Sequence, residues 1–74
     1  MYNFYFKDGH NNDEMKLIKS FETWKEAIDY VAGFVRYDLK FTSYYFRYWH
    51  NPKDENETIV NYGSYIDDIR IIKE

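Results

Sequence analysis

The sequence predicts an α+β fold: a small single domain in which one helix packs on one face of a twisted antiparallel sheet. Three observations predict it. The chain has 74 residues, which is room for one hydrophobic core. Several short segments alternate between apolar and polar residues, as strands do, and one longer segment has apolar residues at helical spacing. In chain order these segments give β-β-α-β-β-β over residues 1–74.

The first two strands are expected to form a hairpin. Tyr2 to Lys7 alternates and is rich in aromatic residues, which is typical of a strand. Residues 8–13, Asp-Gly-His-Asn-Asn-Asp, follow it, and Asp-Gly and Asn-Asn tolerate the positive φ angles of a hairpin loop. Met15 to Ser20 is then expected to be a shorter second strand that pairs with the first.

The helix has the clearest local signals. Thr23 and Glu26 fit a capping box, in which the hydroxyl accepts the Glu26 amide and the carboxylate reaches back. The residues that follow at helical spacing form one apolar stripe: Trp24, Ala27, Ile28, Val31, Phe34 and Val35. The helix is expected to end around Tyr37 or Asp38.

The second half of the chain predicts three more strands. Phe41 to His50 is the longest candidate, and a polar loop with the chain's one proline, residues 51–56, ends it. Glu57 to Tyr62 is the fourth strand, residues 63–64 begin a turn, and Ile69 to Lys73 is the last strand. The expected core consists of Phe4, Phe6, Leu17, Trp24, Ile28, Val31, Phe34, Phe46, Val60, Ile69 and Ile71.

The composition excludes several classes of function. The formal net charge is −3, which suits phosphate neutralisation on duplex DNA poorly, and no apolar run approaches the length of a membrane span. The first residues lack the basic and apolar regions of a signal peptide, so we expect a cytoplasmic protein without a membrane partner. The chain has no cysteine, which removes disulfides and thiolate metal sites.

No motif indicates catalysis, a metal or another cofactor. His10 lies in a turn-like segment whose spacing does not match a calcium loop, and His50 ends a strand before a proline. Ser64 follows a glycine but lacks the Gly-x-Ser-x-Gly elbow. Asp67 and Asp68 are adjacent, so on a strand they would point to opposite faces rather than share a proton. We therefore expect a protein that is not an enzyme.

The aromatic residues indicate the candidate site. Nine tyrosines, six phenylalanines and two tryptophans make up 23% of the chain, more than a small sheet with one helix can bury. In the expected third strand, Tyr44, Phe46 and Tyr48 share one face, and Tyr45, Arg47 and Trp49 share the other.

The candidate partner-binding residues are Tyr45, Arg47 and Trp49, together with Tyr5 of the first strand. Tyr, Trp and Arg are enriched in protein interface hot spots, so a protein interface is the leading hypothesis. Aromatic residues beside arginine on an open sheet can also stack on single-stranded nucleic acid, although the acidic balance makes nucleic acid an unfavoured partner. The third reading is an amphipathic face whose tyrosine hydroxyls lie in water. A two-sided aromatic sheet also favours a C2 homodimer.

Three stretches carry a family resemblance: residues 4–9, Phe-Tyr-Phe-Lys-Asp-Gly; residues 21–27, Phe-x-Thr-x-x-Glu-Ala; and residues 61–65, Asn-Tyr-Gly-Ser-Tyr, before Ile-Arg-Ile at 69–71. They resemble small uncharacterised proteins encoded by phages and prophages of low-GC Gram-positive bacteria, whose use of Asn, Ile, Lys and Tyr is similar. The resemblance implies a modulator or inhibitor of a host protein, for example a counter-defence protein of the anti-CRISPR type, acting in the host cytoplasm. The matched motifs are turns and caps, so no functional residue is carried over.

Overall fold

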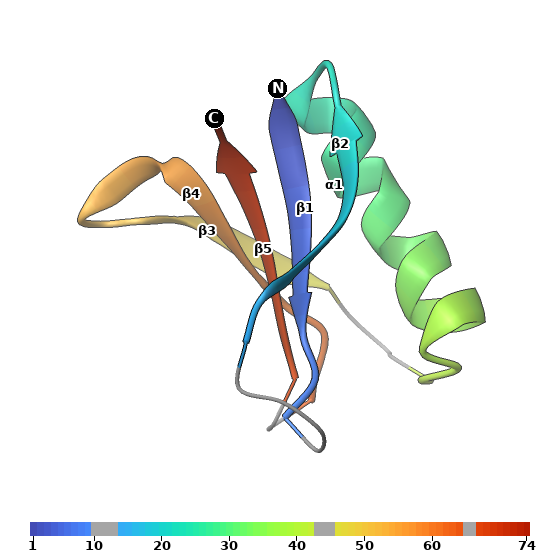
Figure 1. Ribbon diagram of the computed structural model, residues 1–74. Coiled ribbons are helices and arrows are strands. Elements are labelled where there is room, and N and C mark those ends of the chain that lie inside the picture. Colours follow the sequence, from blue (N-terminus) through green and yellow to red (C-terminus); the bar gives the residue numbers. More distant parts are fainter. Residues whose placement is uncertain (10–13, 43–45, 65–66) are drawn as a thin grey trace.

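Figure 1 shows the computed structural model, which describes residues 1–9, 14–42, 46–64 and 67–74. Five strands form one antiparallel sheet and a helix packs on it, as the sequence predicts. The elements in chain order are β1 (Tyr2–Lys7), β2 (Lys16–Phe21), α1 (Trp24–Gly33), the π-helical turn η1 (Phe34–Asp38), β3 (Arg47–Asn51), β4 (Asp54–Asn61) and β5 (Asp68–Lys73). No helix in these ranges has the length and apolar character that crossing a bilayer requires.

The strand order in the sheet is β2-β1-β5-β4-β3, and each strand runs antiparallel to its neighbours. The two hairpins, β1–β2 and β3–β4, therefore do not pair with each other. The last strand, β5, lies between them in the middle of the sheet (Figure 1). This arrangement leaves β2 and β3 as the two edges.

The helix α1 begins at the capping residue that the sequence predicts. The Thr23 hydroxyl accepts a hydrogen bond from the Glu26 amide at 3.2 Å and donates one to the Glu26 carboxylate at 2.9 Å. The helical path continues through η1 to Asp38, where the sequence predicts its end. Lys40 then adopts a φ of 53°, the left-handed conformation that commonly terminates helices.

The core lies between α1 and the strands β2, β1 and β5, because these are the strands that the backbone of the helix approaches among the described residues. Its fully buried residues are Phe4, Ala27, Val31, Phe34, Val35, Val60, Tyr62, Ile69 and Ile71. Phe4 is at the centre, with its ring edge-on to Tyr30 at 5.1 Å and to Phe34 at 5.0 Å. Six of these nine residues belong to the core that the sequence predicts, and Phe6, Trp24 and Ile28 pack against it.

Leu17 was expected in the core, and this prediction is wrong: its side chain is 54% exposed. The cause is a register shift between Phe4 and Tyr5. Phe4 lies opposite Lys19, but Tyr5 lies opposite Leu17, so Ile18 is the extra residue of a β-bulge. Because side chains alternate between the two faces of a strand, this one-residue slip moves Leu17 to the face that the helix does not cover.

The third strand is also shorter than the sequence predicts. It begins at Arg47 rather than Phe41, and residues 43–45 lie outside the described part of the chain. Phe41 instead belongs to the helix terminus, because its amide bonds the Val35 carbonyl at 3.0 Å and its ring packs edge-on to Tyr62. Phe46 was expected in the core but is 41% exposed, since it precedes the strand.

The longest strand is β4, with eight residues, which begins at Asp54 rather than Glu57. Residues 52–53 alone form the hairpin turn, because Asn51 already pairs with Asp54. The side chains at this turn cap its backbone: the Lys53 amide bonds Asn51 Oδ1 at 2.8 Å, and the Asn56 amide bonds Asp54 Oδ1 at 3.0 Å. The segment expected as a loop is therefore mostly strand.

The connection between β4 and β5 closes one end of the core. Gly63 has a φ of 100°, and its amide donates to Asn61 Oδ1 at 2.8 Å. The buried Tyr62 donates its hydroxyl hydrogen to Asp67 at 3.1 Å, and burial together with the Asp67 charge raises the pKa of Tyr62 well above its usual range. Asp67 also accepts the Gly9 amide at 3.2 Å, which ties this connection to the end of β1.

Candidate interface on the open sheet face

The sheet face opposite α1 is the candidate functional surface, and we call it the open face. Alternation along the paired strands assigns its members. They are Asn3, Tyr5, Lys7, Leu17, Ser20, Arg47, Trp49, Asn51, Glu57, Ile59, Asn61, Asp68, Arg70 and Ile72. Every one of them is partly or fully exposed, whereas the face beneath α1 holds the buried core.

Five open-face residues form a row across all five strands. The register places Leu17 opposite Tyr5, and Tyr5 opposite Arg70. On the other side of β5, Arg70 lies opposite Ile59, and Ile59 opposite Trp49. Directly opposed side chains have Cβ atoms about 4.5–5.5 Å apart, so these five side chains form one continuous band, which we call the cross-strand row.

Arg70 is the centre of the cross-strand row. Its side chain is 24% exposed, and its guanidinium lies between two carboxylates: Nε is 3.9 Å from Glu57 Oε1, and Nη2 is 3.7 Å from Asp68 Oδ2. Both separations exceed hydrogen-bond length. The Nη1 atom makes no hydrogen bond within the described residues. Charge attraction to Glu57 and Asp68 therefore holds the guanidinium in place.

Tyr5 is fixed at one side of the row by Glu74. Its hydroxyl donates to Glu74 Oε1 at 2.5 Å, and the Asn3 side-chain amide donates to the same oxygen at 2.9 Å. The two donors lower the pKa of Glu74, with Tyr5 the larger cause, and the carboxylate in turn raises the pKa of the Tyr5 hydroxyl. These bonds restrict the tyrosine ring to one orientation on the open face.

Arg47 and Trp49 lie on the edge strand β3, and both point to the open face, where the sequence places them together. Arg47 is exposed, and Trp49 is 42% exposed. Tyr5 shares the face but lies three strands away. Tyr45, the fourth candidate, lies outside the described residues. The structure therefore places Arg47, Trp49 and Tyr5 on one surface, with the side chains between them supplied by β4 and β5.

The residues that complete the surface are Arg70, Ile59 and Leu17, which are not among the candidates that the sequence pattern indicates. A signal for Arg70 was present: Ile69 and Ile71 are core residues of a strand, so the residue between them must lie on the other face. No comparable signal existed for Leu17, because its position depends on the bulge at Ile18.

The charges on the open face balance. Lys7, Arg47 and Arg70 are the cations among its members, and Glu57 and Asp68 are the anions. The carboxylate of Glu74, which accepts hydrogen bonds from the open-face residues Tyr5 and Asn3, adds a third anion. The anions lie close to the cations, as the contacts of Arg70 illustrate. The surface is therefore aromatic and polar without a strong field of either sign.

The opposite side of the β3–β4 hairpin has a different character. A cavity of about 420 Å³ lies between this hairpin and the start of α1. Beneath it, Thr58 is 2% exposed, and its hydroxyl accepts a hydrogen bond from Trp24 Nε1 at 2.9 Å and lies 3.2 Å from His50 Nδ1. These contacts attach the hairpin to the helix, although no backbone of α1 approaches β3 or β4.

The residues considered for chemistry can be placed only in part. His10 lies outside the described residues, and Ser64 Oγ accepts the Asp67 amide at 3.1 Å. Within the described ranges, no three His, Asp or Glu side chains gather as metal ligands. No protein-family model, curated protein or solved structure matches this chain.

Proposed function

We propose that this protein is a non-enzymatic protein-binding module whose contact surface is the open face. The observation that supports the proposal most is the cross-strand row, in which Trp49, Arg70 and Tyr5 lie in register with the aliphatic residues Ile59 and Leu17. Trp, Tyr and Arg are the residue types enriched in interface hot spots. The sheet and the hydrogen bonds to Glu74 restrict these side chains before binding. Binding therefore costs less side-chain entropy.

The charge pattern favours a protein partner over single-stranded nucleic acid. A binder of nucleic acid needs cations that are free to neutralise phosphates. Here Arg70 lies within 4 Å of two carboxylates, and the three cations of the face are matched by three anions. A protein surface with its own polar groups suits such a balanced face better.

The resemblance to phage and prophage proteins extends the proposal to the partner. We infer that the partner is a host protein and that binding modulates or inhibits it in the host cytoplasm, as a counter-defence protein of the anti-CRISPR type would. This part rests on sequence resemblance alone. The proposal that the open face binds a protein does not depend on which protein is the partner.

The test compares two double variants, each of which removes one arginine and one aromatic residue, from opposite sides of the molecule. Arg47→Ala with Trp49→Ala removes the edge of the open face. Arg36→Ala with Tyr37→Ala is the matched control, because these residues are exposed on η1, and Tyr37 is 70% exposed. A photo-crosslinking amino acid at position 59 then reports contact with a host protein.

We expect one discrete host protein to crosslink to the natural chain and to the control variant but not to the Arg47→Ala, Trp49→Ala variant. Both double variants should unfold within a few degrees of the natural chain, because their side chains are exposed. Equal crosslinking in all three would contradict the proposal. Salt-dependent binding of a labelled single-stranded oligonucleotide at micromolar protein would support the nucleic-acid alternative instead.

A further inference from the structure

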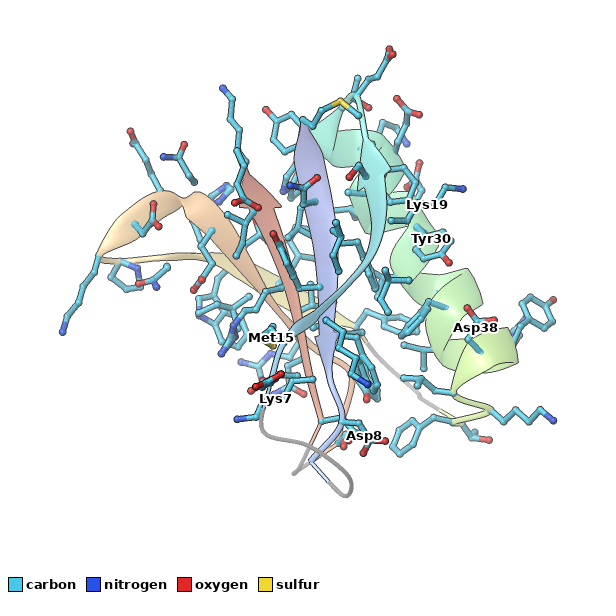
Figure 2. The ribbon with its side chains drawn as sticks, viewed as in Figure 1. Lys7, Asp8, Met15, Lys19, Tyr30 and Asp38 are labelled. Carbon is cyan, nitrogen blue, oxygen red and sulfur yellow. The ribbon has the colours of Figure 1, made fainter. Side chains whose placement is uncertain are left out.

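The two edges of the sheet are protected to different degrees. The β2 edge carries Lys16 and Lys19, has a bulge at Ile18, and lies beside α1. Figure 2 shows Lys19 beside Tyr30 of the helix, and its ammonium is 5.5 Å from the centre of that ring. Lysine, a bulge and a covering helix are the features by which proteins block pairing at an edge strand.

The β3 edge is less protected: it has no lysine, α1 does not lie beside its backbone as a cover, and its register shifts only at its end, between His50 and Asn51. Its five residues include neither lysine, proline nor glycine, and in the described part of the chain it pairs with β4 alone, in regular register from Arg47 to His50. Its aromatic residues are exposed on both faces: Trp49 is 42% exposed on the open face, and Tyr48 is 51% exposed on the other. An added strand would cover apolar surface on both faces.

We propose that the β3 edge binds the β3 edge of a second copy of this chain, antiparallel, about a two-fold axis at Trp49. This register places the two Trp49 side chains opposite each other, Tyr48 opposite His50, and Arg47 opposite Asn51. The Trp49 pair then lies on the axis, and each of the other two contacts occurs twice, as a two-fold interface requires. Opposed aromatic pairs are among the favourable cross-strand pairs.

Charge complementarity identifies the second copy as the occupant. Asn51 Nδ2 donates to Glu57 Oε1 at 2.9 Å, so the carboxylate of Glu57 lies beside the residue that would face Arg47 of the other copy. The symmetric register thus brings one cation to one anion at each end of the interface. It places no like charges opposite each other within Arg47–Asn51.

This inference does not depend on the proposed function, because pairing at an edge leaves the open face uncovered. It joins the two sheets into one of ten strands and makes the two cross-strand rows continuous through the Trp49 pair. A partner would then contact a face of twice the width.

The first test is sedimentation of the natural chain alone, from about 5 μM to about 500 μM, since small interfaces bind weakly. We expect the weight-average mass to rise toward that of a dimer over this range. Arg47→Glu, which places two carboxylates together at each end, should weaken the association at least about tenfold. A monomer at every concentration would overturn the proposal.

The second test uses the absence of cysteine from the natural chain, so each introduced thiol is the only one. Opposed residues have Cα atoms about 4.5–5.5 Å apart, within the range that a disulfide spans. Trp49→Cys should therefore form a disulfide-linked dimer under mild oxidation. Leu17→Cys, on the other edge strand, should not, although Leu17 is more exposed than Trp49. If both cysteine variants formed disulfide-linked dimers at the same rate, the proposal that β3 is the paired edge would be wrong.

The register has its own control. Tyr48→Cys combined with His50→Cys should link two copies, whereas Tyr48→Cys alone should link far more slowly, because residue 48 faces residue 50 and not itself. The reverse result would refute the two-fold axis at Trp49, and this pair retains the tryptophan if its loss weakens folding.

Discussion

Replacing Leu17 by alanine should lower the free energy of unfolding by only about 1 kcal/mol. Full burial of a leucine side chain contributes about 1.5–3 kcal/mol to the free energy of unfolding. Because Leu17 is 54% exposed, the substitution removes less than half of that contribution. Without the bulge at Ile18, the same side chain would lie opposite Phe6 under the helix, where Leu→Ala costs about 2–5 kcal/mol. The loss of unfolding free energy therefore distinguishes the bulged register of β2 from a regular one.

Phe4→Ala is the matched core substitution. Phe4 is fully buried at the same hairpin, and loss of a buried phenylalanine costs about 3–5 kcal/mol. A chain of 74 residues has a total stability of about 4–11 kcal/mol, so this variant should lose a large fraction of it.

Urea unfolding followed by tryptophan fluorescence gives both values, because Trp24 packs against the core. The thermal midpoint of Leu17→Ala should fall by no more than about 4–8 °C. A loss above 2 kcal/mol for Leu17→Ala, with an unchanged denaturant slope, would refute the bulged register.

Three further substitutions test single contacts. Thr58→Val should cost about 1–3 kcal/mol, because it leaves Trp24 Nε1 without its acceptor, and Thr58→Ser, which keeps the hydroxyl, should recover most of it in the same urea titration. Tyr5→Phe removes the main cause of the lowered pKa of Glu74, so a nuclear magnetic resonance titration should find that pKa closer to its ordinary value; an unchanged pKa would contradict the hydrogen bond. Gly63→Ala should cost about 1 kcal/mol by thermal unfolding, because alanine disfavours a φ of 100° although the nearest side chain leaves room for a methyl group.

The sign of the Glu74 effect follows from linkage. A carboxyl group whose pKa is lower in the folded state stabilises that state above its unfolded pKa, and the contribution is lost as the pH falls through the folded pKa. The natural chain should therefore be more stable than Tyr5→Phe at neutral pH. The difference should shrink in acid.

The elements that local chemistry determines could be predicted from the sequence. β1 begins and ends where the alternation of Tyr2–Lys7 places it, and the helix begins after Thr23 because a threonine followed by Glu26 caps it. Phe41 could not be assigned in this way. Its aromatic neighbours read as strand, but its backbone is engaged by the helix terminus and its ring by Tyr62, contacts that no local pattern contains.

The candidate surface was predictable only strand by strand. Alternation alone put Arg47 and Trp49 on one face, and the structure agrees. The strand order was required to bring Tyr5 to the same face, and the register to place Arg70 between them. Long-range pairing therefore decided which residues became neighbours, and a single sequence carries little information about it.

The central position of β5 has a consequence for synthesis. The β1–β2 hairpin and the β3–β4 hairpin are separated in the sheet by a strand that the ribosome makes after both of them, and β1 pairs with β5 across nearly the whole chain, Tyr2 with Lys73. Loop closure over such a separation is slow compared with local pairing. The nascent chain should therefore carry two unjoined hairpins with exposed aromatic residues, and the sheet should close only after β5 has left the exit tunnel.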